Sequence, residues 1–213
     1  MCNRAQRGEP ETIRTTFGAR MFRAVNEGPL IVHPKDPGLV VLQQEGELVI
    51  DQMTWGFPVT LKSAKTGQPL KPKPVNNARF DKLGGFWRRW TGVANRCLIP
   101  TARFAEAIGP KGSMTEAWLS LPDQPVFAWA GLWTDSAEWG RCYTGVMTDN
   151  APELADIHDR SPVIVDPADW ETWLTAPLDV LYQFDRPYPA DRIKVERTAI
   201  PWVKRPPSAP ALL

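Results

Sequence analysis

Cys2, the second residue of the chain, would place two nucleophiles on one residue if Met1 were removed. An N-terminal cysteine carries an α-amine and a thiol two carbons apart. The amine can condense with an aldehyde, and the thiol can then add to the imine and close a five-membered thiazolidine. A free α-amine titrates near ~7.7–8.0 and a free thiol near ~8.5, so both groups are partly nucleophilic at neutral pH. The alternative is that Cys2 is an ordinary residue of a frayed chain end.

The basic residues of the chain are concentrated in the segment 60–96. This segment has nine lysines and arginines and a single acid, Asp81, whereas the remaining residues include 16 basic and 23 acidic side chains. A basic stretch in an otherwise acidic protein indicates a phosphate-binding surface. Aromatic residues in or beside it could stack on the bases of single-stranded nucleic acid; they are Trp55, Phe86, Trp87 and Trp90. A solvated lysine-rich loop is the alternative interpretation.

The composition argues against several classes of protein. No apolar run approaches the ~18–20 residues of a membrane span, and the first nine residues lack the apolar core of a secretory signal. The three cysteines, Cys2, Cys97 and Cys142, favour free thiols in a reducing compartment. With only two histidines, His33 and His158, and no CxxC pair, we expect no metal site and no cofactor. We expect a cytoplasmic protein, nucleoid-associated if bacterial, with no membrane partner.

Short β-rich runs separated by turn residues dominate the chain of 213 residues. The pattern predicts an α+β fold, with one domain built on a curved, largely antiparallel, barrel-like β-sheet and a few short flanking helices. We expect strands at 30–33, 39–42, 48–50, 53–58, 96–100, 125–133, 141–147, 161–165 and 193–197. Strands 125–133 and 141–147 should form a hairpin, and 62–74 a surface loop. The domain should span residues 1–200, and a Pro-rich tail at 201–213 should be disordered or strapped across the surface.

Four short helices are expected, at 9–18, 102–108, 151–157 and 166–174. A proline in the first turn and Gly18 at the end delimit the first of them. Thr101 should cap the second helix, which would carry Glu106, and Asp166 should cap the fourth. His158 should lie at or just beyond the C-terminal end of the third.

Four separated segments of the chain match a known family in their order. They are Met1-Cys2-Asn3-Arg4; Asn77-Ala78-Arg79; Arg96-Cys97-Leu98-Ile99-Pro100 running on to Phe104-Ala105-Glu106; and His158-Asp159-Arg160-Ser161-Pro162-Val163-Ile164, with Trp55-Gly56 and Ala130-Gly131-Leu132-Trp133 between them. Together they resemble the SRAP (SOS-response-associated peptidase) family, which shields abasic sites in single-stranded DNA. The resemblance extends from residue 1 to about Leu174.

The resemblance implies a role for each matching residue. Cys2 would become N-terminal when the protein removes Met1 itself, and would then form a thiazolidine crosslink with the ring-opened aldehyde of an abasic site. Asn77 would orient the Cys2 amine, and Glu106 would be the general acid and base of self-processing and of making or reversing the crosslink. His158 would assist opening of the sugar ring. The candidate DNA contacts are Arg4, Arg79, Arg88 and Arg160; Arg79 and Arg160 would grip the phosphates that flank the lesion.

The expected chemistry needs these residue types. An abasic sugar is mostly a closed hemiacetal, so exposing its aldehyde requires proton transfer to the ring oxygen, which a histidine with a pKa near ~6.5 can perform. Imine formation expels water, and a carboxyl kept partly protonated by burial can supply the proton. Arginines that bind phosphates carry no base information, as suits a lesion without a base. The expected partner is single-stranded DNA with abasic sites, and the protein is expected to be a monomer.

The chain departs from the family pattern near these residues. Asn3 stands where the family has glycine, and asparagine tolerates a left-handed backbone better than most residues. Phe80-Asp81 replaces a small residue and glutamate, and Arg103, Ala105 and Ala107 stand in place of glycine, tyrosine and tryptophan. Loss of the two aromatics should open the pocket around Glu106 and make it less hydrophobic.

Two other functions fit part of the sequence. A self-processing cysteine peptidase that acts on peptides would use the same nucleophile and Glu106, but it would leave the basic stretch and Arg160 unexplained. A non-covalent single-strand binder with an inert Cys2 would use only the basic and aromatic residues.

Overall fold

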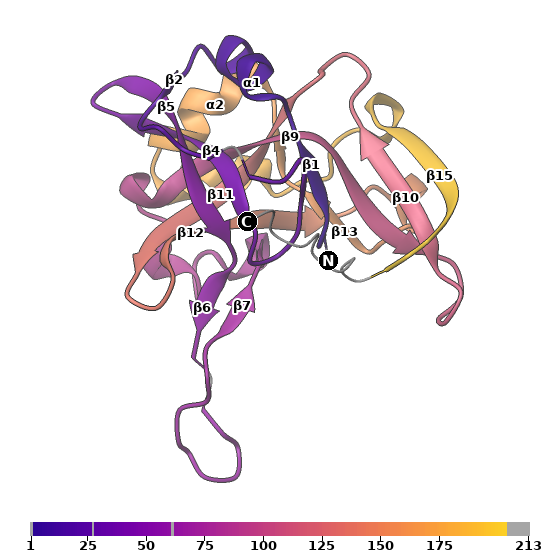
Figure 1. Ribbon diagram of the computed structural model, residues 1–213, viewed down its shortest axis with the longest axis horizontal. Helices are drawn as coiled ribbons and strands as arrows, with labels where there is room; N and C mark the ends of the chain where they lie inside the picture. Colours follow the sequence, from indigo (N-terminus) through magenta and orange to yellow (C-terminus); the bar gives the residue numbers. More distant parts are fainter. Residues whose placement is uncertain (1, 27, 61, 204–213) are drawn as a thin grey trace, which may run out of the picture.

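The computed structural model describes residues 2–26, 28–60 and 62–203. Five of its strands close into a barrel: β4 (Pro37–Gln44), β5 (Glu47–Trp55), β9 (Arg96–Ile108), β11 (Phe127–Ser136) and β12 (Gly140–Asp149). Neighbouring strands run antiparallel, except that β5 and β12 pair in parallel. The pairing of β9 with β11 and the single pair of Val41 with Leu98 between β4 and β9 complete the ring. The predicted single-domain α+β fold on a curved, largely antiparallel sheet is confirmed (Figure 1).

Apolar side chains cover both faces of the barrel wall. In β4, Leu39 and Val41 pack in one buried cluster and Val40 packs in another, because successive side chains of a strand point to opposite faces. The run is therefore continuously hydrophobic and does not alternate with polar residues. Gly145 on β12 is required by this packing, since a Cβ atom there would lie 2.0 Å from the ring of Trp129.

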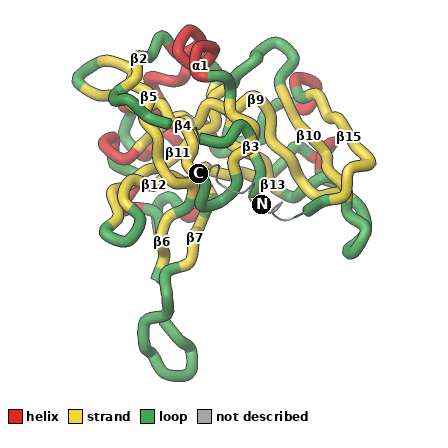
Figure 2. Tube along the Cα trace, in the orientation of Figure 1, coloured by secondary structure: helices red, strands yellow, loops and turns green. Residues whose placement is uncertain are grey.

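Shorter elements surround the barrel. The other strands are β1 (Ala5–Arg7), β2 (Arg20–Met21), β3 (Ile31–Val32), β6 (Phe57–Val59), β7 (Lys73–Val75), β8 (Asn77–Arg79), β10 (Thr115–Ser120), β13 (Arg160–Pro162), β14 (Ile164–Val165) and β15 (Lys194–Pro201). The helices are α1 (Pro10–Phe17), α2 (Trp170–Thr175) and α3 (Leu178–Leu181), with 3-10 turns at Phe80–Lys82, Arg88–Trp90, Val93–Asn95, Pro152–Leu154, Pro167–Asp169, Tyr182–Phe184 and Ala190–Arg192. Figure 2 shows that the helices lie at the periphery. Figure 1 shows that β6, β7 and the loop between them project from the barrel.

The first helix has the bounds that its sequence signals predict. Helix α1 begins at Pro10, whose fixed φ suits the first turn. It ends before Gly18, which adopts the left-handed conformation (φ 59°) that favours glycine. Ile13 and Phe17 form its buried face. Among the residues that the structure describes, no helix is both long and apolar enough to span a membrane.

The predicted helix at 102–108 is wrong, because β9 continues without a break to Ile108. Thr101 does not cap a helix; its hydroxyl donates to the carbonyl of Ile99 at 3.1 Å. Beyond Thr101 the strand pairs with β1 on one side and with β10 on the other. Backbone pairing with two neighbours outweighs the local helical propensity of the segment. Glu106 therefore projects from a paired strand and not from a surface helix.

Two further helix predictions need correction. In place of an α-helix at 151–157, the structure has a 3-10 turn at Pro152–Leu154 followed by hydrogen-bonded turns. Asn150 stabilises this segment by donating from Nδ2 to the carbonyls of Leu154 (3.2 Å) and His158 (3.0 Å). The expected helix at 166–174 begins as a 3-10 turn and continues as α2. Asp166 does not cap it, because its carboxylate accepts a hydrogen bond from the hydroxyl of Tyr188 at 2.9 Å.

The C-terminal strand is longer than predicted. β15 extends to Pro201, and the next residue continues along the same edge, with the N–H of Trp202 donating to the carbonyl of Met114 at 2.7 Å. The remaining part of the predicted tail, 204–213, lies outside the described residues. The loop that was expected to reach residue 74 ends at β7.

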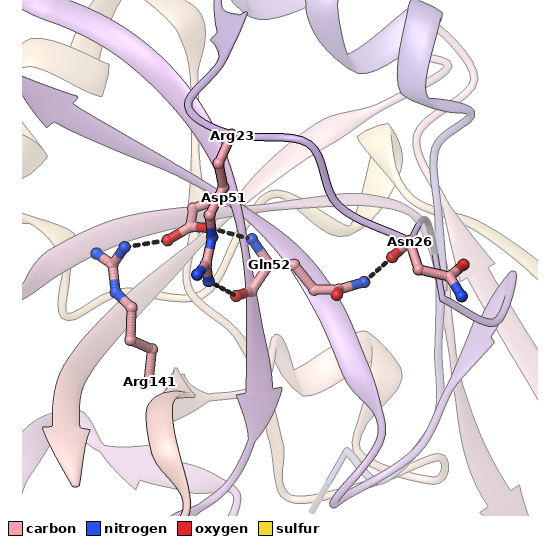
Figure 3. A network of polar contacts seen from close by, with 5 residues as sticks. All are labelled: Arg23, Asn26, Asp51, Gln52 and Arg141. Carbon is pink, nitrogen blue, oxygen red and sulfur yellow. Dashed lines mark hydrogen bonds and ion pairs between the residues drawn. The ribbon is translucent and has the colours of Figure 1, made fainter.

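Asp51 is a fully buried carboxylate that links three segments of the chain (Figure 3). Its Oδ1 accepts hydrogen bonds from Arg23 Nε and from its neighbour's N–H, both at 2.8 Å, and its Oδ2 pairs with Arg141 Nη1. The contact therefore ties β5 to β12 and to the segment after β2.

Replacing Asp51 by alanine should lower the free energy of unfolding by about 3 kcal/mol, because it removes the buried acceptor of hydrogen bonds from Arg23, Arg141 and the N–H of Gln52. Glu47→Ala is the matched control on the same strand, since its ion pair with Arg20 is exposed and such pairs contribute at most about 1 kcal/mol. Urea unfolding of the two variants measures the difference. Equal losses would contradict the structural role given to Asp51.

Candidate active site

Cys2 is fully buried, three residues before β1 begins at Ala5. The carbonyl of Arg4 accepts a hydrogen bond from Cys2 Sγ at 3.6 Å and another from the N–H of Ala105 at 2.9 Å. The antiparallel register pairs Ala5 with Phe104, and continuing it by two residues places Asn3 opposite Glu106. The sheet thus brings the nucleophile, from one end of the sequence, next to the carboxyl on β9.

Two neighbouring asparagines hold the main chain of Cys2. Asn77 on β8 donates from Nδ2 to the carbonyl of Cys2 at 2.7 Å. Its Oδ1 is buried and has no hydrogen-bond partner among the described residues, so it can accept a hydrogen bond from an N–H donor such as an amine. The expectation that Asn77 orients the amine has this geometry in its favour.

Asn76, which no motif in the sequence marks, also contacts the N-terminal segment. Its Nδ2 lies 3.3 Å from the carbonyl of Cys2 and 2.6 Å from Oδ1 of Asn3, and its own carbonyl accepts from Trp55 Nε1 at 2.9 Å. Asn3, which replaces the family's glycine, thus gains a partner. The only sequence signal for this contact was the position of Asn76 next to Asn77.

Glu106 is almost fully buried, with 4% of its surface exposed. Burial raises the pKa of its carboxyl to about 7, and the negative charge of Asp159 acts in the same direction. The expected opening of the pocket by Ala105 and Ala107 has not exposed this carboxyl. A group with a pKa near 7 can both give and take a proton at neutral pH, as a general acid and base must.

The thiol of Cys2 is protonated in this environment. Burial raises its pKa above the usual value, and the charge of Glu106 raises it further. Cys97 and Cys142 are also buried, and burial raises their pKa values, to about 12 for Cys142. The charges of the exposed Asp135 and Glu138 also raise the pKa of Cys142. Cys2 differs from the other two cysteines in that the carboxyl acting on it, Glu106, is buried and has a pKa of about 7, so that it can accept the thiol proton.

His158 lies on the segment that carries Asp159, whose charge also acts on Glu106. Burial lowers the pKa of His158 below its usual value, so the neutral imidazole dominates at pH 7. Its Nδ1 accepts from the N–H of Arg160 at 3.0 Å, and the proton of the neutral ring is therefore on Nε2. Nδ1 also lies 2.7 Å from Asp159 Oδ1, a contact that becomes an ion pair only when the imidazole is protonated.

The raised pKa of Glu106 makes stability depend on pH. Since the folded-state pKa lies above the unfolded value of 4.5, the folded protein binds more protons between pH 4.5 and about 7, and stability falls as pH rises through this window. The stability of Glu106→Gln relative to wild type should therefore be greater at pH 8 than at pH 4, by about 3 kcal/mol. Denaturant unfolding at the two pH values measures this, and a difference independent of pH would contradict it.

The structure brings Arg79 and Arg160 to opposite edges of one strand. Arg79 pairs with Met147 and Arg160 pairs with Asp149, both on β12. The two arginines line a pocket of about 120 Å³, whose other lining residues are Phe80, Asp81, Met147, Thr148, Asp149 and Asp185. Arg79 makes a bidentate contact with Asp81 at 2.8 and 2.9 Å, so a phosphate would have to compete with this partly exposed pair.

Arg4 is not placed as a surface contact for DNA. Its guanidinium is buried, pairs with Glu116 through Nη1 and lies over the ring of Trp202. A phosphate contact requires a side chain that reaches solvent, and only 5% of Arg4 is exposed in the described structure. Arg88, by contrast, is exposed at the 3-10 turn Arg88–Trp90.

The aromatic residues of the basic segment are mostly structural. Trp55 and Trp87 are buried, and Trp87 packs edge-on against Phe57 with ring centroids 5.5 Å apart. They cannot stack on bases, which corrects the expectation for these two residues. Phe86 is 52% exposed, and Trp90 is covered by the guanidinium of Arg89 at 3.7 Å. In the described residues, no three His, Cys, Asp or Glu side chains are grouped to hold a metal ion.

Comparisons with known proteins identify the family of the chain. The model of the family "SOS response associated peptidase (SRAP)" matches residues 1–199. The chain is 30% identical over 174 residues to the abasic site processing protein YoqW of Bacillus subtilis (strain 168), covering 75% of this chain and 74% of YoqW. It is also 30% identical over 173 residues to the abasic site processing protein YobE of the same organism, covering 75% of each chain.

Solved structures share the fold. A protein of Bordetella bronchiseptica is 25% identical and superposes with a TM-score of 0.75, covering 92% of this chain and 99% of its own. A protein of Bacteroides thetaiotaomicron, 16% identical, has the same fold with a TM-score of 0.71, covering 92% and 91% of the two chains. The chain therefore belongs to the SOS response associated peptidase (SRAP) family.

Proposed function

We propose that this protein processes abasic sites in DNA by capturing them covalently through Cys2, after it has removed its own Met1. The observation that carries the proposal is the position of Cys2, whose carbonyl is held by Asn77 and whose thiol is close enough to Glu106 for the charge of that carboxyl to raise its pKa. Burial raises the pKa of Glu106 to about 7. The relatives YoqW and YobE are named as abasic site processing proteins, which supports the same substrate for this chain.

Removal of Met1 needs one nucleophile and one proton carrier. The Cys2 thiol adds to the Met1 carbonyl carbon while its proton passes to the Glu106 carboxylate. Glu106 then returns the proton to the Cys2 nitrogen as the amide C–N bond breaks, which leaves a thioester. One water hydrolyses the thioester, releases methionine and restores the thiol, so the net reaction is hydrolysis of one peptide bond. Asn77 and Asn76 hold the Cys2 carbonyl still through these steps.

Capture of the abasic sugar follows from the freed amine. His158 donates a hydrogen bond from Nε2 to the sugar ring oxygen as the ring opens to the aldehyde. The Cys2 amine adds to C1, and protonated Glu106 gives its proton to the departing hydroxyl, so that one water leaves and an imine forms. The thiol sulfur then adds to C1, and its proton passes by way of Glu106 to the nitrogen. The product is a thiazolidine, and no oxidant or reductant is consumed.

Arg79, Arg160 and the exposed Arg88 supply positive charge for the phosphates on either side of the lesion. Arg160→Ala should weaken binding to every single-stranded sequence alike and reduce the slope of log affinity against log salt by about 0.7, since one phosphate contact is lost. Arg14→Ala, which removes an exposed arginine of α1 paired with Glu11, is the matched control and should leave the slope unchanged. Fluorescence anisotropy over a salt series measures both, and identical slopes would remove Arg160 from the DNA-binding surface.

Three single strands test the function. One carries an abasic site, one is undamaged, and one carries a tetrahydrofuran analogue that cannot open to an aldehyde. The first alone should give a shifted band that survives heating on a denaturing gel. A heat-stable band with the tetrahydrofuran strand, or none with the abasic strand, would contradict capture of the aldehyde. Loss of Met1 without any adduct would leave only peptidase activity.

A further inference from the structure

The end of the described chain covers Arg4, two residues from the nucleophile. The ring of Trp202 lies 4.2 Å from Arg4 Cζ, and the carbonyl of Val203 accepts a hydrogen bond from Arg4 Nη2. The N–H of Trp202 donates to the carbonyl of Met114 at 2.7 Å, which fixes this segment to the residue before β10. The two residues form a strap that holds the guanidinium between a ring and a carbonyl.

The other side of the guanidinium is held by β10. Arg4 pairs with Glu116, and both side chains are less than 10% exposed. The second carboxylate oxygen of Glu116 accepts from Trp118 Nε1 at 2.9 Å, and the Glu116 carbonyl accepts from the hydroxyl of Thr198 on β15 at 3.1 Å. Figure 1 shows β10 and β15 side by side next to β9. Glu116, on β10, and the strap, which follows β15, are therefore carried by two strands that pair with each other.

Through its main chain, the same arginine positions Cys2. The Arg4 carbonyl accepts from Cys2 Sγ and from the N–H of Ala105, the residue before Glu106. The side chain held by Trp202 and Glu116 and the carbonyl bonded to Cys2 and Ala105 belong to one residue, so a shift of the side chain can move the carbonyl. The family match ends at residue 199, so Trp202 and Val203 lie beyond the matched segment.

We propose that Trp202 is a positioning residue for Cys2 and acts through Arg4, by keeping the Arg4–Glu116 pair in place. The inference rests on the proposed covalent capture, because its effect is on the rate of that step. It predicts that loss of the indole slows bond formation and leaves DNA affinity unchanged, since Arg4 itself does not contact the DNA.

The test compares three variants in single-turnover crosslinking at saturating abasic DNA. Trp202→Ala should lower the first-order rate by about 10- to 100-fold, because a displacement of about 1 Å between reacting groups can cost about 10²-fold. Trp202→Phe, which keeps an aromatic face for the guanidinium, should stay within about 3-fold of wild type. Val203→Ala is the matched control: it keeps the carbonyl that Arg4 uses, and its side chain is exposed, so its rate should equal that of wild type.

Two further measurements separate positioning from other roles. The affinity for undamaged single-stranded DNA should be the same for all variants. The rate of Cys2 alkylation, monitored by the mass of the N-terminal peptide, should be higher in Trp202→Ala because β1 is held less firmly. A wild-type rate in Trp202→Ala, or a gain in DNA affinity that shows the strap to be a cover over a DNA contact, would overturn the inference. If Trp202→Ala does not fold, the crosslinking rates of Trp202→Phe and Trp202→Leu are compared in its place. Equal rates for these two variants would overturn the role of the aromatic ring. Absence of any adduct with wild type would refute the proposed function instead.

Discussion

Replacing Cys2 by alanine should abolish the heat-stable adduct with abasic DNA. The variant has no thiol to close the ring, so any imine that forms stays open to hydrolysis, and self-removal of Met1 also loses its nucleophile. We expect no band above background in a denaturing gel after heating, under conditions in which the wild-type protein is fully converted.

The matched control for this variant is Cys97→Ala. Cys97 is equally buried, and its pKa is raised by burial alone, so its loss should leave the adduct intact. A heat-stable band with Cys2→Ala would show that another nucleophile reacts. Loss of the band with both variants would show that the assay reports folding and not chemistry.

Replacing Glu106 by glutamine should slow adduct formation by about 10²–10⁴-fold, the range that general acid and base catalysis contributes. Glutamine keeps the size of the side chain but cannot carry a proton between thiol, amine and departing hydroxyl. Single-turnover time courses with saturating abasic DNA measure the rate, and the affinity for undamaged strands should not change. The exposed Glu138→Gln serves as the matched control.

The pH dependence of the rate provides a second readout for the same carboxyl. The pKa of Glu106 is raised to about 7. A plot of the logarithm of the wild-type rate against pH should therefore change slope near pH 7, and this change should be missing from the glutamine variant. A variant with wild-type rate and an unchanged pH profile would remove Glu106 from the mechanism.

The same burial that suits Glu106 for proton transfer makes it costly to the fold. Above pH 7 the protein must bury a charge or keep a proton on the carboxyl, and glutamine avoids this cost. The expected gain in stability and loss of rate in one variant is the pattern of a residue retained for its chemistry.

Local signals in the sequence were sufficient for the barrel and for α1. The apolar runs of β4, β5, β11 and β12 and the turn residues between them predict the sheet, and Pro10 with Gly18 delimits the first helix. The segment 102–108 was misassigned to a helix because its partners, β1 and β10, are remote or follow later in the sequence. Pairing on both sides is not visible in the segment itself.

The residues of the candidate site could be predicted only where the family resemblance marks them individually. It singled out Cys2, Asn77, Glu106 and His158. The structure places Asn77 in contact with Cys2, and Glu106 close enough for its charge to act on the Cys2 thiol; the roles of these residues remain predictions. It did not reveal that Arg4 is buried against Glu116 and Trp202. That arrangement joins Arg4, Glu116 and Trp202, which are far apart in the sequence, and no spacing in the sequence encodes their contacts.

The most direct test of the central claim is the intact mass of the protein before and after incubation with abasic single-stranded DNA. The account predicts a starting mass lower than that of the full sequence by one methionine residue. After incubation, it predicts a product equal to the sum of processed protein and DNA less one water, with the DNA attached to the N-terminal peptide. A protein that retains Met1, or an adduct located on any other peptide, would contradict capture through the amine and thiol of Cys2.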